Sequence, residues 1–497
     1  MSHNNDETYL DIPKHSFIDE RETYYTKKIR RLKVFCTVLV CLCLLLCGAI
    51  AGGIHYLRQR PVTASDKFER ALGIMESEWF FADGIDNVEE RLIDQALKGM
   101  TTNEEDLHTS YMTREEQESF VQGINRNFVG IGVQFFQITD GVPMIERVFR
   151  GAPAEEAGVL PGDIIYSVEG VLVEELSNDA IVDLVRGEAG TVVHMQFKRG
   201  DEIVSLNITR REISATVYGT VKDDVGVVEI SQFGNTTAAE VQVLLEEYKE
   251  AGIDRLIIDL RGDGGGYVAS LQQVAGLFLD SDAIALIEED NKGARLVEKV
   301  KGTKCWNSEM PIVILVNGDT ASAAEAFTLA MKEQRPEVTI VGTTTYGKGT
   351  AQITASLGDG SFIKYTYAKW LSPNGTWVNG TGITPDETVE LPEVLETIVY
   401  EFTGEEDVYR YDSVGQAVRL AQLTLEYLGY PVDRTDGYFS AATENALRAF
   451  AQDEGLEYNG ELNETLSNQL VQAVYFDWKT QGDRDTQMLR ALEIVHE

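Results

Sequence analysis

Cysteine is scarce in this chain and poorly placed for disulfides. The 497 residues include five cysteines, of which four (Cys36, Cys41, Cys43 and Cys47) lie in one apolar stretch and only Cys305 lies elsewhere. If that stretch lies in a membrane, the remaining thiol has no partner for an intramolecular disulfide. The sequence therefore offers no disulfide framework, although this scarcity does not exclude an exported protein.

Positive charge is also in short supply. The chain carries 43 lysines and arginines against 81 aspartates and glutamates, which gives a net charge of -38. Such a chain lacks the basic stripe that neutralises phosphates, so the composition argues against nucleic-acid binding. An acidic balance of this size is typical of a well-solvated surface, and the length allows about three or four domains.

Histidine is the third scarce residue. The six histidines are His3, His15, His55, His108, His194 and His496, so none falls within residues 220–392. A serine–histidine–aspartate triad in that region would have to borrow His108 or His194 from another part of the chain. A serine–lysine pair would need only local residues.

One long apolar run stands near the start. Residues 34–52 carry no charge and can span a bilayer, and the basic segment Lys27–Lys33 precedes them. This asymmetry predicts a membrane anchor over residues 34–57, with residues 1–33 as a cytoplasmic tail and the remainder outside the cell. A signal peptide cleaved near Ala49–Ala51 and a buried core helix are the alternatives.

Residues 62–125 repeat apolar side chains at helical spacing, as at Val88, Leu92, Ala96 and Leu97. The pattern predicts a helical segment. Such a segment would pack against the rest of the chain or pair two chains in a homodimer, and the sequence does not choose between these roles.

Residues 213–400 alternate apolar strand patterns with helical ones. The strand candidates are VGVVEISQF, RLIIDLRG, PIVILVNG and VTIVG. This alternation predicts a largely parallel α/β sheet. Functional groups in such sheets gather where the strands end, so the loops after the strands are the place to look for chemistry.

Two of these loops could stabilise negative charge. The glycine run of Asp259–Gly266 (DLRGDGGG) permits positive φ and outward-pointing N–H groups, although a plain tight turn has the same composition. The small residues of Asn317–Glu325 (NGDTASAAE) place Ser322 at the start of a helix, where the dipole favours an oxyanion. A serine at this position could also be a simple helix cap.

The third loop, Tyr346–Gln352 (YGKGTAQ), presents Lys348 between two glycines. If it is desolvated there, its pKa falls and the neutral amine can serve as a base, oriented by Gln352. An exposed surface lysine is the alternative. The spacing from Gly342 to Lys348 also fits a nucleotide-binding P-loop, but Gly349 replaces the magnesium-binding hydroxyl and a strand pattern follows where a helix is needed.

Together the three loops resemble the signature of carboxyl-terminal processing (tail-specific) serine peptidases, D-L-R-x-N-P-G-G, S-A-S-A-S-E and G-K-G-x-x-Q. The resemblance implies Ser322 as nucleophile, Lys348 as base, Gln352 as its support, and the backbone N–H groups of Gly265 and Ala323 as oxyanion donors. The chain departs from the signature at Asp263 and Gly264, where the family prefers asparagine and proline.

The same resemblance implies a multidomain α/β fold with a ClpP/crotonase-like protease core, and an endopeptidase that acts on proteins or peptides. It implies no metal and no organic cofactor. An inactive scaffold that only binds peptides is the alternative, and the intact Ser322, Lys348 and Gln352 argue against it.

Residues 127–212 resemble a PDZ domain, mainly through GAPAEEAGVLPGDIIYSVEG. PDZ domains bind an extended peptide as an added strand. The resemblance implies a peptide-binding site at Gly130, Ile131, Gly132, Val133 and Leu184. The apolar members of this set could equally be core residues.

Residues 408–476 resemble a small helical peptidoglycan-binding domain, through a helix ending in LGY, a DGYF turn and a TENALRAF helix. The resemblance implies peptidoglycan as a partner. A three-helix bundle without a ligand is the alternative. A calcium loop around Asp433 does not fit, because Arg434 occupies a ligand position.

Overall fold

The computed structural model describes residues 16–59, 62–137, 142–174, 176–200, 202–307, 309–396, 408–478 and 484–497. Contacts divide the chain into two compact units, Met1–Ala96 and Leu97–Glu497. Residues 1–15 of the predicted cytoplasmic tail and residues 397–400 of the predicted core lie outside the described residues.

The first unit is helical. It contains α1 (Ser16–Gln59), α2 (Ala64–Ser77), the short η1 (Ala82–Gly84) and the start of α3 (Val88–Thr101). Within α1, Glu22–Tyr56 is long and apolar enough to cross a membrane, a property that a signal sequence near the N-terminus shares. Thr63 caps α2 by accepting the N–H of Asp66.

The predicted helical segment 62–125 is not helical throughout. After α3 the chain forms a short strand, β1 (Ser110–Met112), before α4 (Arg114–Asn125). β1 pairs with β18 (Phe362–Leu371), which lies about 250 residues later in the chain. A three-residue strand is too short to show the alternation of apolar and polar residues that predicts a strand. Only its pairing with β18 in the folded chain reveals it.

The PDZ-like part is a twisted antiparallel sheet with two helices. Its strands run in the order β3 (Val133–Phe136), β4 (Met144–Val148), β5 (Ile164–Val168), β7 (Val192–Arg199) and β8 (Glu202–Thr209), with β6 (Val171–Leu172) beside β5. β2 (Asn127–Gly130) and β9 (Arg211–Ser214) pair with each other, and the helices are α5 (Pro153–Ala157) and α6 (Asn178–Val185). Ser177 caps α6 by accepting the N–H of Ala180.

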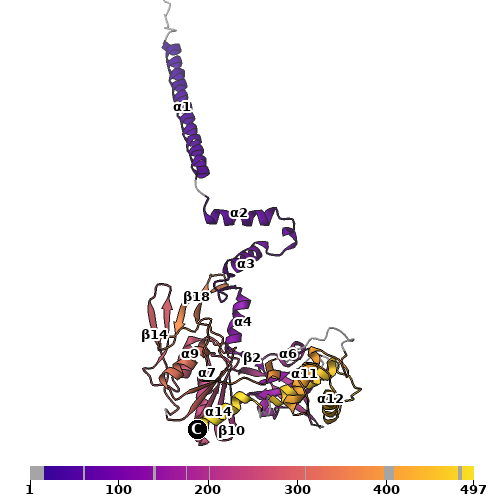
Figure 1. Cartoon of the computed structure of the whole chain (residues 1–497). Coiled ribbons are helices and arrows are strands. Elements are labelled where there is room, and N and C mark those ends of the chain that lie inside the picture. The colour runs from indigo at the N-terminus through magenta and orange to yellow at the C-terminus, as the bar shows by residue number, and fades with distance from the viewer. Residues whose placement is uncertain are drawn as a thin grey trace, which may run out of the picture. The chain divides into compact units, whose positions relative to one another are not determined.

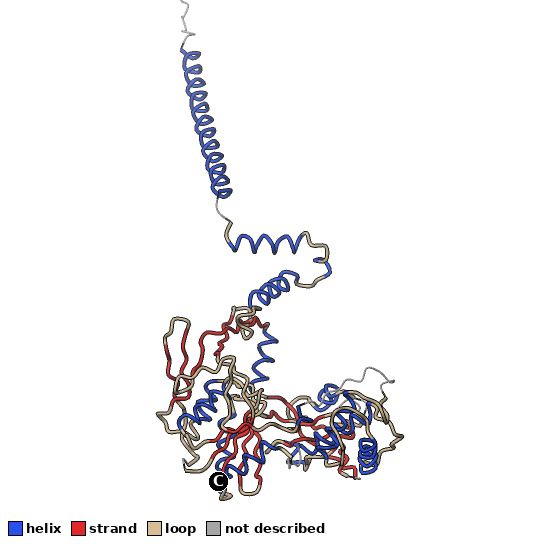
Figure 2. Tube along the Cα trace, in the orientation of Figure 1, coloured by secondary structure: helices blue, strands red, loops and turns tan. Residues whose placement is uncertain are grey.

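The parallel sheet predicted from the alternating pattern is present (Figures 1 and 2). Its order is β10 (Val217–Lys222), β11 (Val225–Ile230), β12 (Arg255–Asp259), β15 (Ile312–Val316), β16 (Thr339–Gly342) and β19 (Glu387–Thr388), and only β10 runs antiparallel to its neighbour. One face packs under α7 (Thr237–Glu250), α8 (Val268–Ala275) and α9 (Ala323–Gln334). Every second strand residue therefore lies in this larger core.

A second, antiparallel sheet stands beside the first. It joins β1, β18, β13 (Ile284–Asp290) and β14 (Arg295–Lys299), and β17 (Thr350–Ser356) pairs with β18. β17 follows Lys348 directly, so the strand that argued against a P-loop is present.

The C-terminal part contains the helices of the predicted peptidoglycan-binding-like domain and, beyond them, α14, which the sequence analysis did not predict. α10 (Glu393–Glu396) leads to α11 (Gln416–Leu428), α12 (Ala441–Asp453) and α13 (Glu464–Phe476), and then α14 (Thr486–His496) returns to the parallel sheet (Figure 1). Met488, Ala491 and Val495 of α14 pack on the sheet face opposite α7 and α9. The sheet is thus covered on both faces, as a parallel sheet requires.

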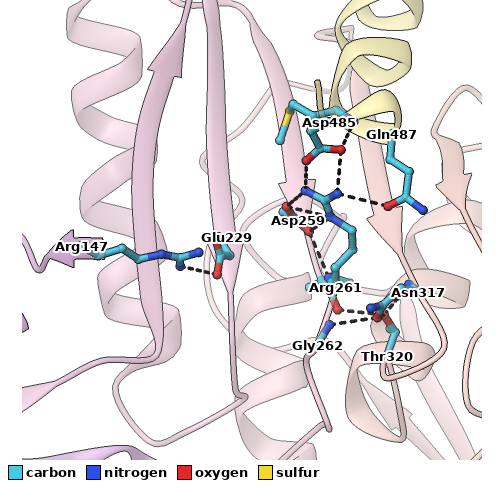
Figure 3. Close-up of polar contacts among 11 residues, drawn as sticks. Arg147, Glu229, Asp259, Arg261, Gly262, Asn317, Thr320, Asp485 and Gln487 are labelled. Atoms are coloured by element: carbon cyan, nitrogen blue, oxygen red, sulfur yellow. Dashed lines mark hydrogen bonds and ion pairs between the residues drawn. The ribbon is translucent and has the colours of Figure 1, made fainter. Parts of the chain in front are cut away.

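A buried arginine attaches α14 to the loop after β12 (Figure 3). The guanidinium of Arg261 donates to Asp259 at 2.7 Å, pairs with Asp485 at 2.8 Å and donates to Gln487 at 3.1 Å. Asp485 also caps α14 by accepting the N–H of Met488 at 3.0 Å. Arg261, Asp259 and Asp485 are all largely buried. Loss of one partner would leave a buried charge with less compensation, which destabilises the fold.

Replacing Asp485 with alanine is therefore expected to lower the free energy of unfolding by about 2–4 kcal/mol, because it removes a helix cap and leaves Arg261 with one carboxylate. Urea unfolding of the full chain, followed by tryptophan fluorescence, would measure the loss. Glu493→Ala is the control, because Glu493 pairs with Arg490 on the exposed face of the same helix. Equal losses in the two variants would contradict the role given to Asp485.

Candidate active site

The three loops predicted to carry chemistry meet at one cavity of about 640 Å³. Ser322 and Ala323 come from the start of α9, Lys348 from the loop before β17, Gln352 from β17 itself, and Gly264 from the turn after β12. A cavity of this size can enclose a few residues of a peptide. Loops that are widely separated in the sequence therefore form one site.

Ser322 has an unusual backbone for a residue that is not glycine. It lies between β15 and α9 with φ 56° and ψ -114°. Such a conformation is strained for an L-residue and persists only where the surroundings impose it. Ser322 is half-buried at the start of α9, where the helix dipole would favour a developing negative charge.

Gly265 lies directly against Ser322. Its φ is 102°, and a β-carbon at this position would stand 2.8 Å from the Ser322 β-carbon and 2.9 Å from the Ala323 nitrogen. Only glycine can occupy this place without displacing Ser322. The Gly265 N–H, expected to face an oxyanion, donates here to Asp263 Oδ1 at 2.7 Å.

The loop that carries Lys348 is held rigidly. Trp370 Nε1 donates to the Lys348 carbonyl at 2.8 Å, and Trp377 Nε1 donates to the Gly349 carbonyl at 2.8 Å. A β-carbon on Gly347 would come within 2.7 Å of the Gly382 nitrogen, so the glycine permits this close backbone approach. Packing of this kind fixes the direction in which the lysine leaves its loop.

The environment of Lys348 favours its neutral form. Burial lowers the pKa of its ammonium, and repulsion from Lys364 lowers it further, against weaker opposing effects of Glu325 and Asp106. A buried amine with a neighbouring positive charge is easier to deprotonate than a surface lysine. Lys348 is therefore not the exposed lysine of the alternative interpretation.

Glu325 is the residue that the sequence reasoning missed. Its side chain is fully buried and accepts four hydrogen bonds, from Ser322 N, Thr345 Oγ1, Gly347 N and Lys348 N, at 2.6 to 2.9 Å. One carboxylate thus fastens the serine loop to the lysine loop. The signal was available, because Glu325 stands three residues after Ser322, where a capping glutamate reaches back to the helix start.

Gln352 lies in the same cavity but is held by other residues. Its Nε2 donates to Thr350 Oγ1 at 2.9 Å and to Thr366 Oγ1 at 3.2 Å, and Thr366 Oγ1 donates to Asp106 at 3.1 Å. Over the ranges that the structure describes, no hydrogen bond joins Gln352 to Lys348. The side chain of Gln352 is therefore held by β17 and β18, and Asp106, before β1, acts on it only through Thr366.

The two histidines considered as alternative bases lie in different surroundings. His194 is an exposed residue of β7, and its ring contacts Asn207 at 2.5 Å. His108 lies near the site, where burial and the charge of Lys348 lower the pKa of its ring. Of the two, only His108 is within electrostatic reach of the lysine.

The predicted PDZ residues divide between the core of the PDZ-like part and the edge of that core. Ile131 is 1% exposed and belongs to the core, while Val133 on β3 and Leu184 on α6 are partly buried at its edge. Gly132 has φ 80°, and a β-carbon there would overlap Ala152. Gly130 ends β2 and is buried.

Val133 also lines a cavity of about 1120 Å³ that extends along β2 to the end of α4. An ion pair between Arg147 of β4 and Glu229 of β11, 2.5 Å long, links the PDZ-like part to the parallel sheet (Figure 3). β4 of the PDZ-like part and β11 of the parallel sheet are thus connected by charged side chains that are largely buried.

Comparison with known proteins identifies three domain families in this chain. Residues 224–389 match the model of peptidase family S41, residues 144–199 match a PDZ domain model, and residues 414–470 match a peptidoglycan binding domain model. The first range contains the three loops that line the cavity, the second covers β4 to β7 of the PDZ-like part, and the third covers α11, α12 and the first half of α13.

Similar proteins share this organisation over most of their length. The "Carboxy-terminal processing protease CtpA" of Bacillus subtilis (strain 168) is 32% identical over 475 residues, covering 94% of this chain and 99% of that protein. A "Probable CtpA-like serine protease" of Staphylococcus aureus (strain bovine RF122 / ET3-1) is 31% identical over 420 residues, covering 84% and 83%.

Among solved structures, the "Photosystem II D1 C-terminal processing protease" is 25% identical, covers 67% of this chain and 95% of that one, and gives a TM-score of 0.39. The family assignment rests on the sequence relatives that align over most of their length. On their strength, this chain belongs to the carboxy-terminal processing serine proteases of peptidase family S41, with a PDZ domain and a C-terminal peptidoglycan-binding-like domain.

Proposed function

We propose that this protein is a serine endopeptidase that works through Ser322 and Lys348. Neutral Lys348 takes the proton from Ser322 Oγ, which attacks the scissile carbonyl carbon. The lysine then gives this proton to the leaving amine as the acyl-enzyme forms. Water, deprotonated by the same lysine, hydrolyses the ester and regenerates the serine.

The oxyanion of each tetrahedral intermediate would lie near the start of α9. The backbone N–H groups of Ala323 and Gly265 are the proposed donors, and the helix dipole adds to their field. Gln352, which lines the same cavity, would contact the substrate or Lys348. No step in this sequence requires a metal or an organic cofactor.

The convergence of a strained serine and a desolvated lysine on one cavity carries this proposal. The test is hydrolysis of an unfolded protein by the full chain in detergent, with labelling by a fluorophosphonate. Wild type should cleave and be labelled, and Ser322→Ala should do neither. Wild-type protein that is folded but neither cleaves nor labels would favour the peptide-binding scaffold instead.

We further propose that the PDZ domain captures a substrate C-terminus or extended segment beside Val133 and Leu184, and that the core has a ClpP/crotonase-like topology. α1 would anchor the protein with its basic end in the cytoplasm and the catalytic part outside. Protease added to intact cells should then remove the C-terminal part. Protection of that part until the cells are lysed would contradict this orientation.

The C-terminal helical domain would bring the protease to peptidoglycan. The family match over residues 414–470 supports this partner. Cosedimentation of the full chain with purified peptidoglycan tests this proposal. A chain that stays in the supernatant would contradict it and would favour a structural role for the C-terminal part, whose α14 packs on the parallel sheet.

A further inference from the structure

The turn after β12 contains a carboxyl group that the mechanism above does not use. Asp263 is 0% exposed, and its Oδ1 accepts the N–H of Gly265 at 2.7 Å. Its Oδ2 is buried and has no hydrogen-bond partner among the described residues. A half-satisfied buried carboxyl beside a nucleophile calls for an explanation, since such groups are costly.

Asp263 lies where it can control the oxyanion turn. Its own carbonyl accepts the N–H of Ala321 at 2.9 Å, so the turn is joined to the serine loop on one side. On the other side, the Gly265 carbonyl accepts from Phe233 N at 2.9 Å and from Gln232 Nε2 at 2.7 Å. Of the two backbone polar groups of Gly265, the N–H is therefore the one whose partner is the aspartate side chain.

The charge state of Asp263 decides what this contact does. As a carboxylate it would hold the Gly265 N–H strongly and place a negative charge next to the point where the oxyanion forms. As a neutral acid it would offer only a carbonyl oxygen, a weaker acceptor that an oxyanion can displace. Neutral Asp263 can thus hold the turn in its conformation and still allow the Gly265 N–H to bind the oxyanion.

The surroundings favour the neutral form. Complete burial raises the pKa of Asp263 well above its usual range, against smaller opposing effects of the Gly265 N–H and of Arg126 at the end of α4. The serine loop meets the turn with Ala321 and Ala323, which carry no charge. Within the described ranges, Arg126 is the charged side chain whose field acts on this carboxyl.

We propose that Asp263 is the positioning residue of the oxyanion turn and that it does this as a neutral acid. The inference rests on the proposed Ser322 and Lys348 chemistry and adds an upper pH limit to it. Ionisation of Asp263 at alkaline pH would lock the Gly265 N–H away from the substrate, so activity would fall on both sides of an optimum.

The test compares Asp263→Asn and Asp263→Ala with wild type, as full chains in detergent, by peptide hydrolysis across pH. Wild type should show an alkaline loss of kcat that Asp263→Asn lacks, because the amide keeps the acceptor oxygen and cannot ionise. Asp263→Ala should lose about a hundredfold in kcat at every pH with little change in KM. An alkaline limb that is the same in wild type and Asp263→Asn would overturn the inference.

A second measurement does not depend on activity. A buried acid with a raised pKa stabilises the fold below its unfolded pKa and loses that contribution as pH rises through the folded pKa. The midpoint of thermal unfolding of Asp263→Asn, relative to wild type, should therefore increase with pH above about pH 4. A difference that is constant with pH would count against the neutral acid, whereas hydrolysis that survives in Ser322→Ala would instead overturn the proposed function.

Discussion

Replacement of Lys348 with methionine is expected to lower kcat by about ten-thousand-fold or more, with the fold intact by circular dichroism. Methionine keeps most of the apolar stem that packs in the cavity and removes the amine that accepts the serine proton. Losses of this size are typical when one member of a catalytic unit is removed. Activity that survives the change would show that another residue is the base, and His108 would be the next candidate to test.

Lys364→Met is the matched control for this prediction. Lys364 lines the same cavity, and its charge lowers the pKa of Lys348. Without that repulsion, Lys348 would hold its proton more tightly, so the acid limb of the pH–rate profile should move to higher pH while turnover persists above it. An acid limb that does not move would contradict the assignment of this limb to Lys348.

Glu325→Ala is expected to lower the free energy of unfolding by about 3–5 kcal/mol and to abolish hydrolysis. Truncation leaves the N–H groups of Ser322, Gly347 and Lys348 without their acceptor in a region closed to water. Because the same carboxylate joins both catalytic loops, the nucleophile and the base should lose their relative position. Denaturant unfolding and fluorophosphonate labelling would measure the two effects.

Glu333→Ala on the same helix is the control for Glu325→Ala. Glu333 accepts one hydrogen bond, from Asn374 N, at a partly exposed position. Its loss should cost less than about 1 kcal/mol and leave labelling of Ser322 unchanged. If the two variants are equally stable, Glu325 does not tie the loops together.

Much of the site could be predicted from local patterns. The strands before the three loops are continuous apolar runs, and the glycines around Lys348 and after Asp259 mark backbone that other residues cannot adopt. The helix after Ser322 was also visible, because small and helix-forming residues follow a strand there. Each of these features depends on a few consecutive residues, so the sequence shows it directly.

The hydrogen bonds within the site could not be predicted in the same way. Gln352 was expected to orient Lys348, yet its amide is bound by Thr350 and Thr366, and Thr366 comes from a neighbouring strand. The engagement of Gly265 by Asp263 depends on a turn closed on both sides by backbone from other segments. Such choices among partners depend on distances that sequence spacing does not contain.

The sequence by itself determined the apolar N-terminal helix, the alternation that builds a parallel sheet, and the residue types able to act as nucleophile and base. Tertiary structure alone decided that β1 completes a sheet with β18, that α14 covers the open face of the parallel sheet, and that Glu325 joins the two catalytic loops. The physical reason is the separation along the chain over which each kind of interaction acts. Periodicity and backbone preference act between neighbours, whereas burial of a sheet face and satisfaction of a buried carboxylate require residues that meet only after the chain has folded.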